Sequence, residues 1–154
     1  MTTQQITKKY GAPNETGKGY LVKIQLPYPM KLAWDTDTVV NTMMCHELVS
    51  KNFLDVFNEI HRVYGYEKIK EFGIDLFGGC FNYRKMRGGN SWSTHSWGIA
   101  IDLHPSANSL KTPYNNSLFS KPEYKKLHEI FEKHGFENLG KTKGYDAMHW
   151  QIKQ

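Results

Sequence analysis

Residues 93–102, with the sequence STHSWGIAID, join a predicted turn to the strand that decides the fold. From the tryptophan of this stretch onward the residues alternate and are rich in β-branched types, which predicts a core strand. A carboxylate is rare in such a strand unless it is paired or bound to a metal, so Asp102 is a candidate ligand. His95, on the turn that enters the strand, can come back beside it. Because Gly98 and Ala100 are small, we expect a metal or a substrate backbone to approach closely there.

A third ligand comes from the far end of the chain, in the sequence DAMHW at residues 146–150. Together, His95, Asp102 and His149 offer two imidazoles and one carboxylate, which is a suitable donor set for zinc. Three protein ligands with one open position for water are typical of catalytic zinc, whereas structural sites use four. The sequence therefore predicts a catalytic zinc site.

The predicted site also contains groups that could carry out hydrolysis. Asp146 is three residues before His149, so its carboxylate can face the same cleft. It could accept a proton from the attacking water and then pass it to the leaving amine. Either Arg84 or Arg87, just upstream, could neutralise the negative charge of a tetrahedral intermediate.

Substrate contacts are assigned to four residues around these groups, namely Arg87, Ser93, Trp97 and Trp150. Ser93 is expected to brace the turn or a ligand rather than to attack the substrate. For the two tryptophans, packing in the core is the alternative interpretation.

The other histidines do not form a competing site. His46 and Glu47 begin an HExxH-like pattern, but Ser50 stands where the second ligand is required. His128 and His134 are six residues apart on a predicted helix, so they do not share a face. The chain also contains no GxSxG nucleophile motif and no phosphate-binding loop.

The composition is that of an ordinary globular domain. The 154 residues carry a formal charge of +5, with 39% hydrophobic and 23% charged residues. No basic run is longer than two residues, so the charge alone does not select a partner, and a nucleic-acid-binding domain is a third alternative suggested only by the charge of +5. Cys45 and Cys80 form no CxxC pair, and each is expected to be a small buried residue. No apolar run is long enough to cross a membrane, and residues 1–9 lack the apolar core of a secretion signal.

The pattern divides the chain into an N-terminal arm, residues 1–19, and a single domain, residues 20–154. The arm is polar and is expected to lie extended on the domain. Within the domain we predict a strand at 20–26 ended by Pro27 and Pro29, one helix or two between 36 and 64 capped by Asp35 or Thr36, a short helix at 66–72, a strand at 80–84, a loop at 86–93, a strand at 97–104, a surface loop at 105–120, a helix from Pro122 to His134 and a strand at 148–152. This order has no regular βαβ alternation and indicates an α+β fold with a mostly antiparallel sheet.

The two motifs resemble the signature of the LAS family of zinc peptidases, which is SxHxxGxAxD followed much later by (D/E)xxHW. Residues 93–102 match the first motif at every fixed position, and residues 146–150 match the second. The family contains D-alanyl-D-alanine carboxypeptidases, D,D-dipeptidases of vancomycin resistance, and L-alanyl-D-glutamate endopeptidases used as phage endolysins.

The resemblance implies the Hedgehog/D,D-peptidase fold, in which an antiparallel sheet carries the metal. It implies these roles: zinc ligands His95, Asp102 and His149, general base Asp146, and transition-state stabiliser Arg84, with Arg87 as the alternate. Many relatives carry an aromatic residue at the position of Ala147, so the shape of the subsite there is left open.

By this resemblance we expect a zinc-dependent hydrolase of the peptidoglycan stem peptide, an L-alanyl-D-glutamate endopeptidase of endolysin type. A D-alanyl-D-alanine carboxypeptidase is the alternative within the class. A non-catalytic zinc-binding module of a cell wall or virion is the alternative from another class, against which Asp146 argues. We expect a monomer that binds neither nucleic acid nor a membrane. Because no secretion signal is recognised, we expect synthesis in the cytoplasm and release to the wall through a lysis pore, as for phage or prophage proteins.

Overall fold

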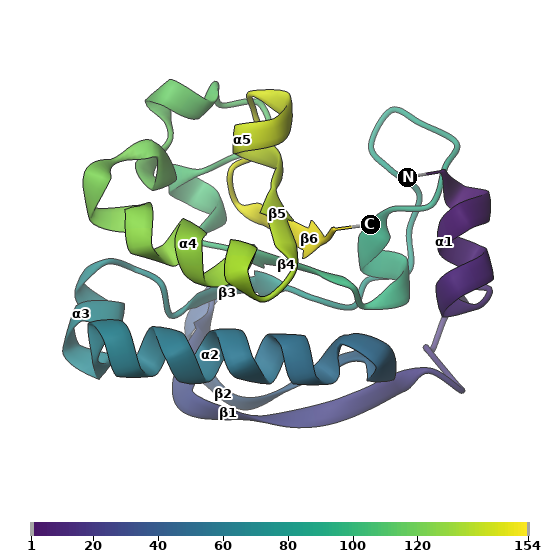
Figure 1. Cartoon of the computed structure of the whole chain (residues 1–154), viewed down its shortest axis with the longest axis horizontal. Helices are drawn as coiled ribbons and strands as arrows, with labels where there is room; N and C mark the ends of the chain where they lie inside the picture. The colour runs from purple at the N-terminus through teal and green to yellow at the C-terminus, as the bar shows by residue number, and fades with distance from the viewer. Residues whose placement is uncertain (1, 154) are drawn as a thin grey trace.

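The computed structural model of the chain describes residues 2–153. Its centre is a six-stranded sheet in the order β2-β1-β3-β4-β6-β5 (Figure 1). The strands are β1 (Leu21–Leu32), β2 (Asp35–His46), β3 (Leu76–Gly79), β4 (Ala100–Leu103), β5 (Phe136–Asn138) and β6 (His149–Ile152). Neighbouring strands are antiparallel except β1 and β3, which run parallel. The expected α+β class with a mostly antiparallel sheet is therefore confirmed.

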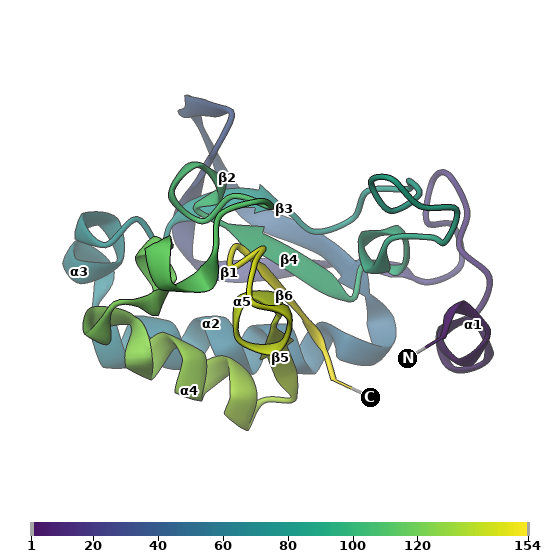
Figure 2. The same cartoon turned by 90° about the horizontal axis from the view of Figure 1, so that it is seen from above.

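Helices cover one face of this sheet. The helices are α1 (Thr3–Tyr10), α2 (Ser50–Tyr64), α3 (Tyr66–Glu71), α4 (Lys125–Lys133) and α5 (Leu139–Lys143). The two longest, α2 and α4, lie side by side against the sheet (Figures 1 and 2). Their buried side chains join Ile101 and Leu103 of β4 in one core. Because successive strand residues point to opposite faces, Asp102 between them points away from the helices.

The predicted helical region at 36–64 is half wrong. Residues 35–46 form strand β2, and only α2, which begins at Ser50, is helical. The spacing of apolar residues between 35 and 46 fits the period of a helix and that of a strand. Pairing with β1 selects the strand. Asp35 and Thr36 therefore cap no helix. The three-residue 3-10 turn η1 (Glu47–Val49) follows β2 directly and leads into α2.

Strand β1 is longer than predicted, because Pro27 and Pro29 lie inside it rather than ending it. The register of β1 against β2 shifts between Gln25 and Met30, so both prolines fall where the ladder is irregular. Proline is tolerated at such a position because no ladder hydrogen bond from its nitrogen is required.

The N-terminal arm is a helix rather than an extended segment. Thr2 caps α1 by accepting a hydrogen bond from the backbone of Gln5, and the Gln5 side chain returns a bond to Thr2. The helix packs through Ile6 and Tyr10, both buried. The Tyr10 carbonyl oxygen lies 2.8 Å from Nε2 of His46, which ties this segment to the end of β2.

The strand predicted at 80–84 lies a few residues earlier, as β3. In this strand Phe77 is paired with Leu103 and Gly79 with Asp102. A Cβ atom on Gly78 would lie 2.9 Å from Cβ of Asp102, so the glycine allows β3 to pass close to β4.

The C-terminal half follows the sequence pattern more closely. Strands β4 and β6 fall within the predicted ranges, and α3 does too. Helix α4 follows the 3-10 turn η6 (Pro122–Tyr124), close to the predicted start at Pro122. The loop at 105–120 contains three further 3-10 turns, η3 (Pro105–Ala107), η4 (Tyr114–Asn116) and η5 (Leu118–Ser120). Strand β5 and helix α5 were not predicted. Within residues 2–153, no helix combines the length and apolarity that a bilayer crossing requires.

Candidate metal centre

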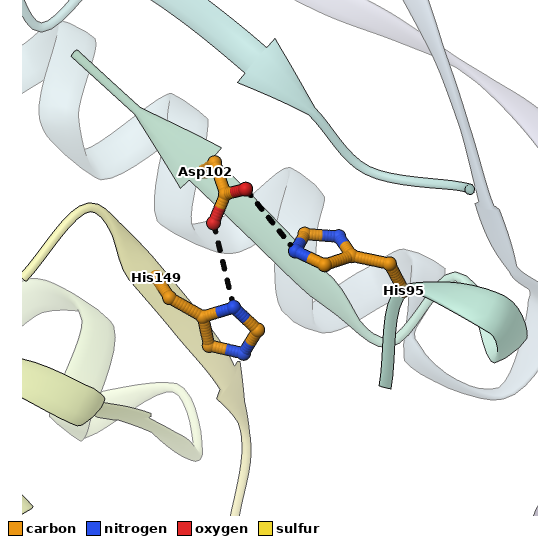
Figure 3. A group of neighbouring side chains, drawn as sticks. All are labelled: His95, Asp102 and His149. Atoms are coloured by element: carbon orange, nitrogen blue, oxygen red, sulfur yellow. Dashed lines mark ion pairs between the residues drawn. The ribbon is translucent and has the colours of Figure 1, made fainter. Parts of the chain in front are cut away.

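Two neighbouring strands and one turn bring the three predicted ligands together. Asp102 on β4 is paired directly with His149 on β6. His95 lies on the 3-10 turn η2 (Thr94–Trp97), which precedes β4. Oδ2 of Asp102 lies 3.2 Å from Nε2 of His95, and Oδ1 lies 3.4 Å from Nδ1 of His149 (Figure 3). Ligand atoms of the three residues all lie within 4.8 Å of one another, as a shared metal ion requires.

The ring of His95 is held by its other nitrogen. Nδ1 lies 2.7 Å from the carbonyl oxygen of Cys80, so Nδ1 carries the proton and donates it. This leaves the lone pair of Nε2 directed toward Asp102. A metal-binding histidine is oriented in this way, with one ring nitrogen donating and the other free to coordinate.

In His149 the nitrogen that is held is Nε2 rather than Nδ1, and a series of hydrogen-bonded side chains holds it. Its Nε2 lies 2.9 Å from Oε1 of Gln151, and the amide nitrogen of Gln151 donates to Oε1 of Glu137 over 3.2 Å. The hydroxyl of Thr94 also donates to Oε1 of Gln151, over 3.1 Å. Nε2 of His149 therefore carries the proton, and Nδ1 is free to face Asp102.

The centre has the electrostatics of an ion-binding site. His95 and His149 are 3% and 7% exposed, and Nε2 of His95 and Oδ1 of Asp102 have no hydrogen-bond partner. Burial alone would raise the pKa of Asp102, but the adjacent His95 and His149 hold it well below its ordinary value. Buried lone pairs without donors are costly in a folded protein, and a cation would satisfy them. The donor set fits zinc, with room for substrate or water.

Asp146 faces the same cavity from a tight turn. The backbone nitrogen of His149 donates to the carbonyl oxygen of Asp146 over 3.2 Å, which closes the turn and explains the three-residue spacing. Asp146 has a φ of 66°, a strained conformation that non-glycine residues adopt mainly at special sites. Its side chain is 7% exposed, and Oδ1 has no partner. Burial raises the pKa of Asp146, although His149 opposes the shift. A raised pKa suits a group that must accept and release protons.

The spacing of the first motif has a local structural cause. Ser93 caps η2, since its hydroxyl oxygen accepts from the backbone nitrogen of His95 over 3.3 Å. Gly98 was expected to leave room for a metal or substrate, and this expectation is wrong. Its φ is 70°, and a Cβ there would lie 2.9 Å from the backbone nitrogen of His46. Gly98 therefore serves the contact with the end of β2, where its carbonyl oxygen accepts from His46.

A cavity of about 630 Å³ opens on one side of the ligands. Asp146 and His149 line it, together with four cationic side chains, Arg84, Arg87, Lys111 and Lys143. Arg84 is half-buried, and its backbone nitrogen donates to the hydroxyl of Ser96. Four cations around one metal centre favour a substrate that carries carboxylates.

A second recess of about 400 Å³ also borders Asp102. Its wall includes His95, Gly78, Gly79, Phe81 and Trp34. Arg84 and Asp102 line both spaces, so the two recesses meet at the metal centre.

Two of the residues assigned to substrate binding lie elsewhere. Trp97 and Trp150 have no exposed surface and line neither recess. Trp97 donates its indole hydrogen to the carbonyl oxygen of Gly11, and Trp150 stacks on Phe131. Both tryptophans therefore belong to the core, the alternative interpretation. Each indole ring buries a large apolar area, so its burial in the core stabilises the fold.

The competing residues have structural roles. His46 bonds to the backbone on both sides of its ring. His128 lies 2.8 Å from the carbonyl oxygen of Phe119, and His134 lies 3.0 Å from Glu59. Cys45 and Cys80 are both buried and free, as expected.

Comparison with known proteins agrees with this geometry. Residues 87–152 match the model of a family described as D-alanyl-D-alanine carboxypeptidase. The resemblance to the LAS-type zinc peptidases is thereby confirmed over that stretch, which contains His95, Asp102, Asp146 and His149. No curated protein and no solved structure gives a significant match.

Proposed function

We propose that the protein is a zinc-dependent endopeptidase that cleaves the L-alanyl-D-glutamate bond of the peptidoglycan stem peptide. The observation that carries this proposal is the triad of His95, Asp102 and His149 at the junction of two recesses, with Asp146 facing one of them. The family description supports peptidase chemistry on a cell-wall peptide. The likeness does not extend to a named relative, so the choice of bond rests on the shape and charge of the site.

A zinc ion held by the three ligands would polarise the scissile carbonyl and lower the pKa of a bound water to about 7. In this proposal Asp146 accepts a proton on Oδ1 and returns that proton to the leaving amine, and the lack of a hydrogen-bond partner for Oδ1 among the described residues supports this role. Arg84 lines both recesses, so its guanidinium can neutralise charge that develops between them. Arg87 at the rim can attract a carboxylate of the substrate, and Ser93 holds the turn that carries His95.

The two recesses favour an endopeptidase over a carboxypeptidase. An endopeptidase must accommodate chain on both sides of the scissile bond, whereas a carboxypeptidase closes around a terminal carboxylate. Here two separate recesses border Asp102, and each could hold one side of a substrate chain. The stem peptide carries carboxylates on the D-glutamate side of the proposed bond, which matches the four cations of the larger recess.

A D-alanyl-D-alanine carboxypeptidase remains the second candidate, because the family description names that activity. The cationic rim of the larger recess could equally bind a terminal carboxylate. Release to the wall through a lysis pore stays a prediction under either activity.

Mass spectrometry of products from purified peptidoglycan distinguishes the two. We expect new amino termini at D-glutamate from the zinc-loaded protein, and release of free D-alanine alone would refute the endopeptidase. Asp146→Asn should retain zinc and lose hydrolysis, with Lys153→Asn as a control for an exposed charge outside both recesses. An Asp146→Asn protein with full activity would reject Asp146 as the base.

A further inference from the structure

The tip of the β1–β2 hairpin carries an exposed tryptophan beside the metal centre. Trp34 is 67% exposed, more than any other large hydrophobic residue described as exposed. Single exposed apolar residues are common and need no explanation on their own. Trp34 differs because it lines the recess that also contains His95 and Asp102.

The backbone that carries Trp34 is a tight turn tied to the sheet rather than a free loop. Leu32 pairs with Asp35, so Ala33 and Trp34 form a two-residue turn. The backbone nitrogen of Ala33 donates to the carbonyl oxygen of Phe77 over 2.9 Å, which ties the turn to β3. Figure 2 shows the hairpin tip projecting from the body of the protein beside β3.

Part of the recess wall is backbone without side chains. Gly78 and Gly79 line the recess, and a Cβ on Gly79 would meet nothing within 4 Å. Phe81 adds a second aromatic surface, and Asn82 adds an amide. The recess of about 400 Å³ lies within the range of roughly 300–1,000 Å³ typical of small-molecule sites.

The two recesses differ in charge. Apart from the metal-binding residues, Arg84 is the charged side chain that lines the Trp34 recess. The larger recess also has Arg87, Lys111 and Lys143. An anionic ligand is therefore favoured in the larger recess, and a ligand without net charge in the smaller one. An aromatic ring, an amide and exposed backbone together suit a pyranose with acetamido groups, which presents an apolar ring face and amide hydrogen-bonding groups.

We propose that the Trp34 recess binds the N-acetylated amino sugar that is attached to the N-terminal side of the cleaved peptide. This inference rests on the proposed function, since an L-alanyl-D-glutamate endopeptidase has the sugar on one side of the scissile bond and the carboxylates on the other. The indole of Trp34 stacks on the ring face of the sugar. The charge difference between the recesses then sets the direction in which the substrate lies across the metal.

The test compares two soluble substrates with the zinc-loaded protein. One is N-acetylmuramoyl-L-alanyl-D-glutamyl-diamino acid, and the other is the same peptide with an acetyl group in place of the sugar. We expect wild type to prefer the muramoyl substrate, as the ratio of kcat/KM values. Trp34→Ala should lower that ratio about 3- to 10-fold, the range of one aromatic stacking contact, and Trp34→Phe should restore part of it. Val39→Ala, an exposed apolar residue of the same hairpin that lines neither recess, is the matched control.

A Trp34→Ala ratio equal to that of wild type overturns the inference, and so does a wild type without preference. Equal thermal unfolding of wild type and Trp34→Phe shows that folding is not the cause of a change. If neither substrate is cleaved by wild type, the proposed function fails, and a binding measurement then decides the inference separately. Tryptophan fluorescence of the zinc-loaded protein should change on titration with a peptide-free N-acetylmuramic acid disaccharide whose lactyl carboxyl is capped as a methylamide, and Trp34→Phe should lose the change. Identical titration curves for the two proteins would overturn the sugar site.

Discussion

Gln151 holds the His149 ring by the nitrogen that points away from Asp102, and its removal gives a sharp test of the site. Oε1 of Gln151 lies 2.9 Å from Nε2 of His149, so it keeps the proton on that nitrogen. Without this acceptor, the buried imidazole can turn over or carry its proton on Nδ1, the atom that faces Asp102. Gln151→Leu removes the acceptor and preserves most of the volume.

The contacts of His149 determine how much zinc affinity Gln151→Leu should lose. Leaving a buried donor without its acceptor costs about 1–3 kcal/mol, and each 1.4 kcal/mol is a factor of 10 in affinity. Loss of an outer partner of a metal-binding histidine typically weakens metal binding about 10- to 100-fold. The Thr94 hydroxyl lies 3.3 Å from the same nitrogen and can replace part of the lost contact. We therefore expect the Kd for zinc to rise about 10-fold in Gln151→Leu, and toward 100-fold when Thr94→Val is added.

Zinc affinity is measured by competition with a chelating indicator on protein stripped of metal. Glu137→Gln is the matched control, because it keeps an acceptor oxygen for the amide of Gln151 and should weaken zinc binding less than Gln151→Leu. Circular dichroism checks that each variant is folded. A folded Gln151→Leu protein with the zinc Kd of wild type would refute the assigned orientation of His149.

Three further predictions test other parts of the structure. His149→Ala should lose zinc, and full metal content by elemental analysis would reject it as a ligand. Gly78→Ala should lower the free energy of unfolding by about 1–3 kcal/mol in urea titrations, because the new Cβ would lie 2.9 Å from Cβ of Asp102 and 3.0 Å from its carbonyl oxygen; an unchanged midpoint would contradict this close approach. Burial lowers the pKa of His128, so the unfolded state takes up the proton first and stability falls as the pH drops below about 6.5. The fall in Tm between pH 7 and pH 5 should be smaller in His128→Gln, and an equal fall would exclude His128 as a contributor.

The metal ligands could be predicted because each lies in a short motif whose local structure is simple. His95 needs only the capped turn before β4, and Asp102 needs only a buried strand position. What the sequence does not contain is the register that pairs Asp102 with His149. That pairing joins segments more than 40 residues apart by chain position, and a shift of one residue would point His149 to the other face.

The outer partner of His149 was missed although a signal existed. Gln151 follows His149 by two residues on a strand, so both side chains point to the same face. The alternation of side chains along a strand is therefore enough to predict that Gln151 lies in the site. Its acceptor role depends on the tautomer of His149 and on Glu137, which strand pairing brings opposite Gln151.

The hairpin at 21–46 was missed for a different reason. Its turn residues, Ala33 and Trp34, are not the Asn-Gly or Gly-rich pairs that mark two-residue hairpin turns. The turn is held instead by a contact with β3, which is distant in sequence. Because tertiary contacts decide this element, local propensity had no basis for finding Trp34 beside the metal centre.

The match to the peptidase family and the second recess fall on different parts of the chain, and this division bears on specificity. The metal ligands and the proposed base, His95, Asp102, His149 and Asp146, all lie within residues 87–152. The residues that line the Trp34 recess, apart from His95 and Asp102, all precede residue 87, and they include Arg84, which the proposed chemistry also uses. A change at Trp34 can therefore alter which substrate reaches the metal without moving a ligand. If that division holds, replacing Trp34 should change substrate preference while zinc affinity stays that of wild type, whereas replacing Gln151 should do the reverse. A Trp34 variant that lost zinc would show that the hairpin supports the metal centre itself, and the separation of chemistry from selectivity would fail.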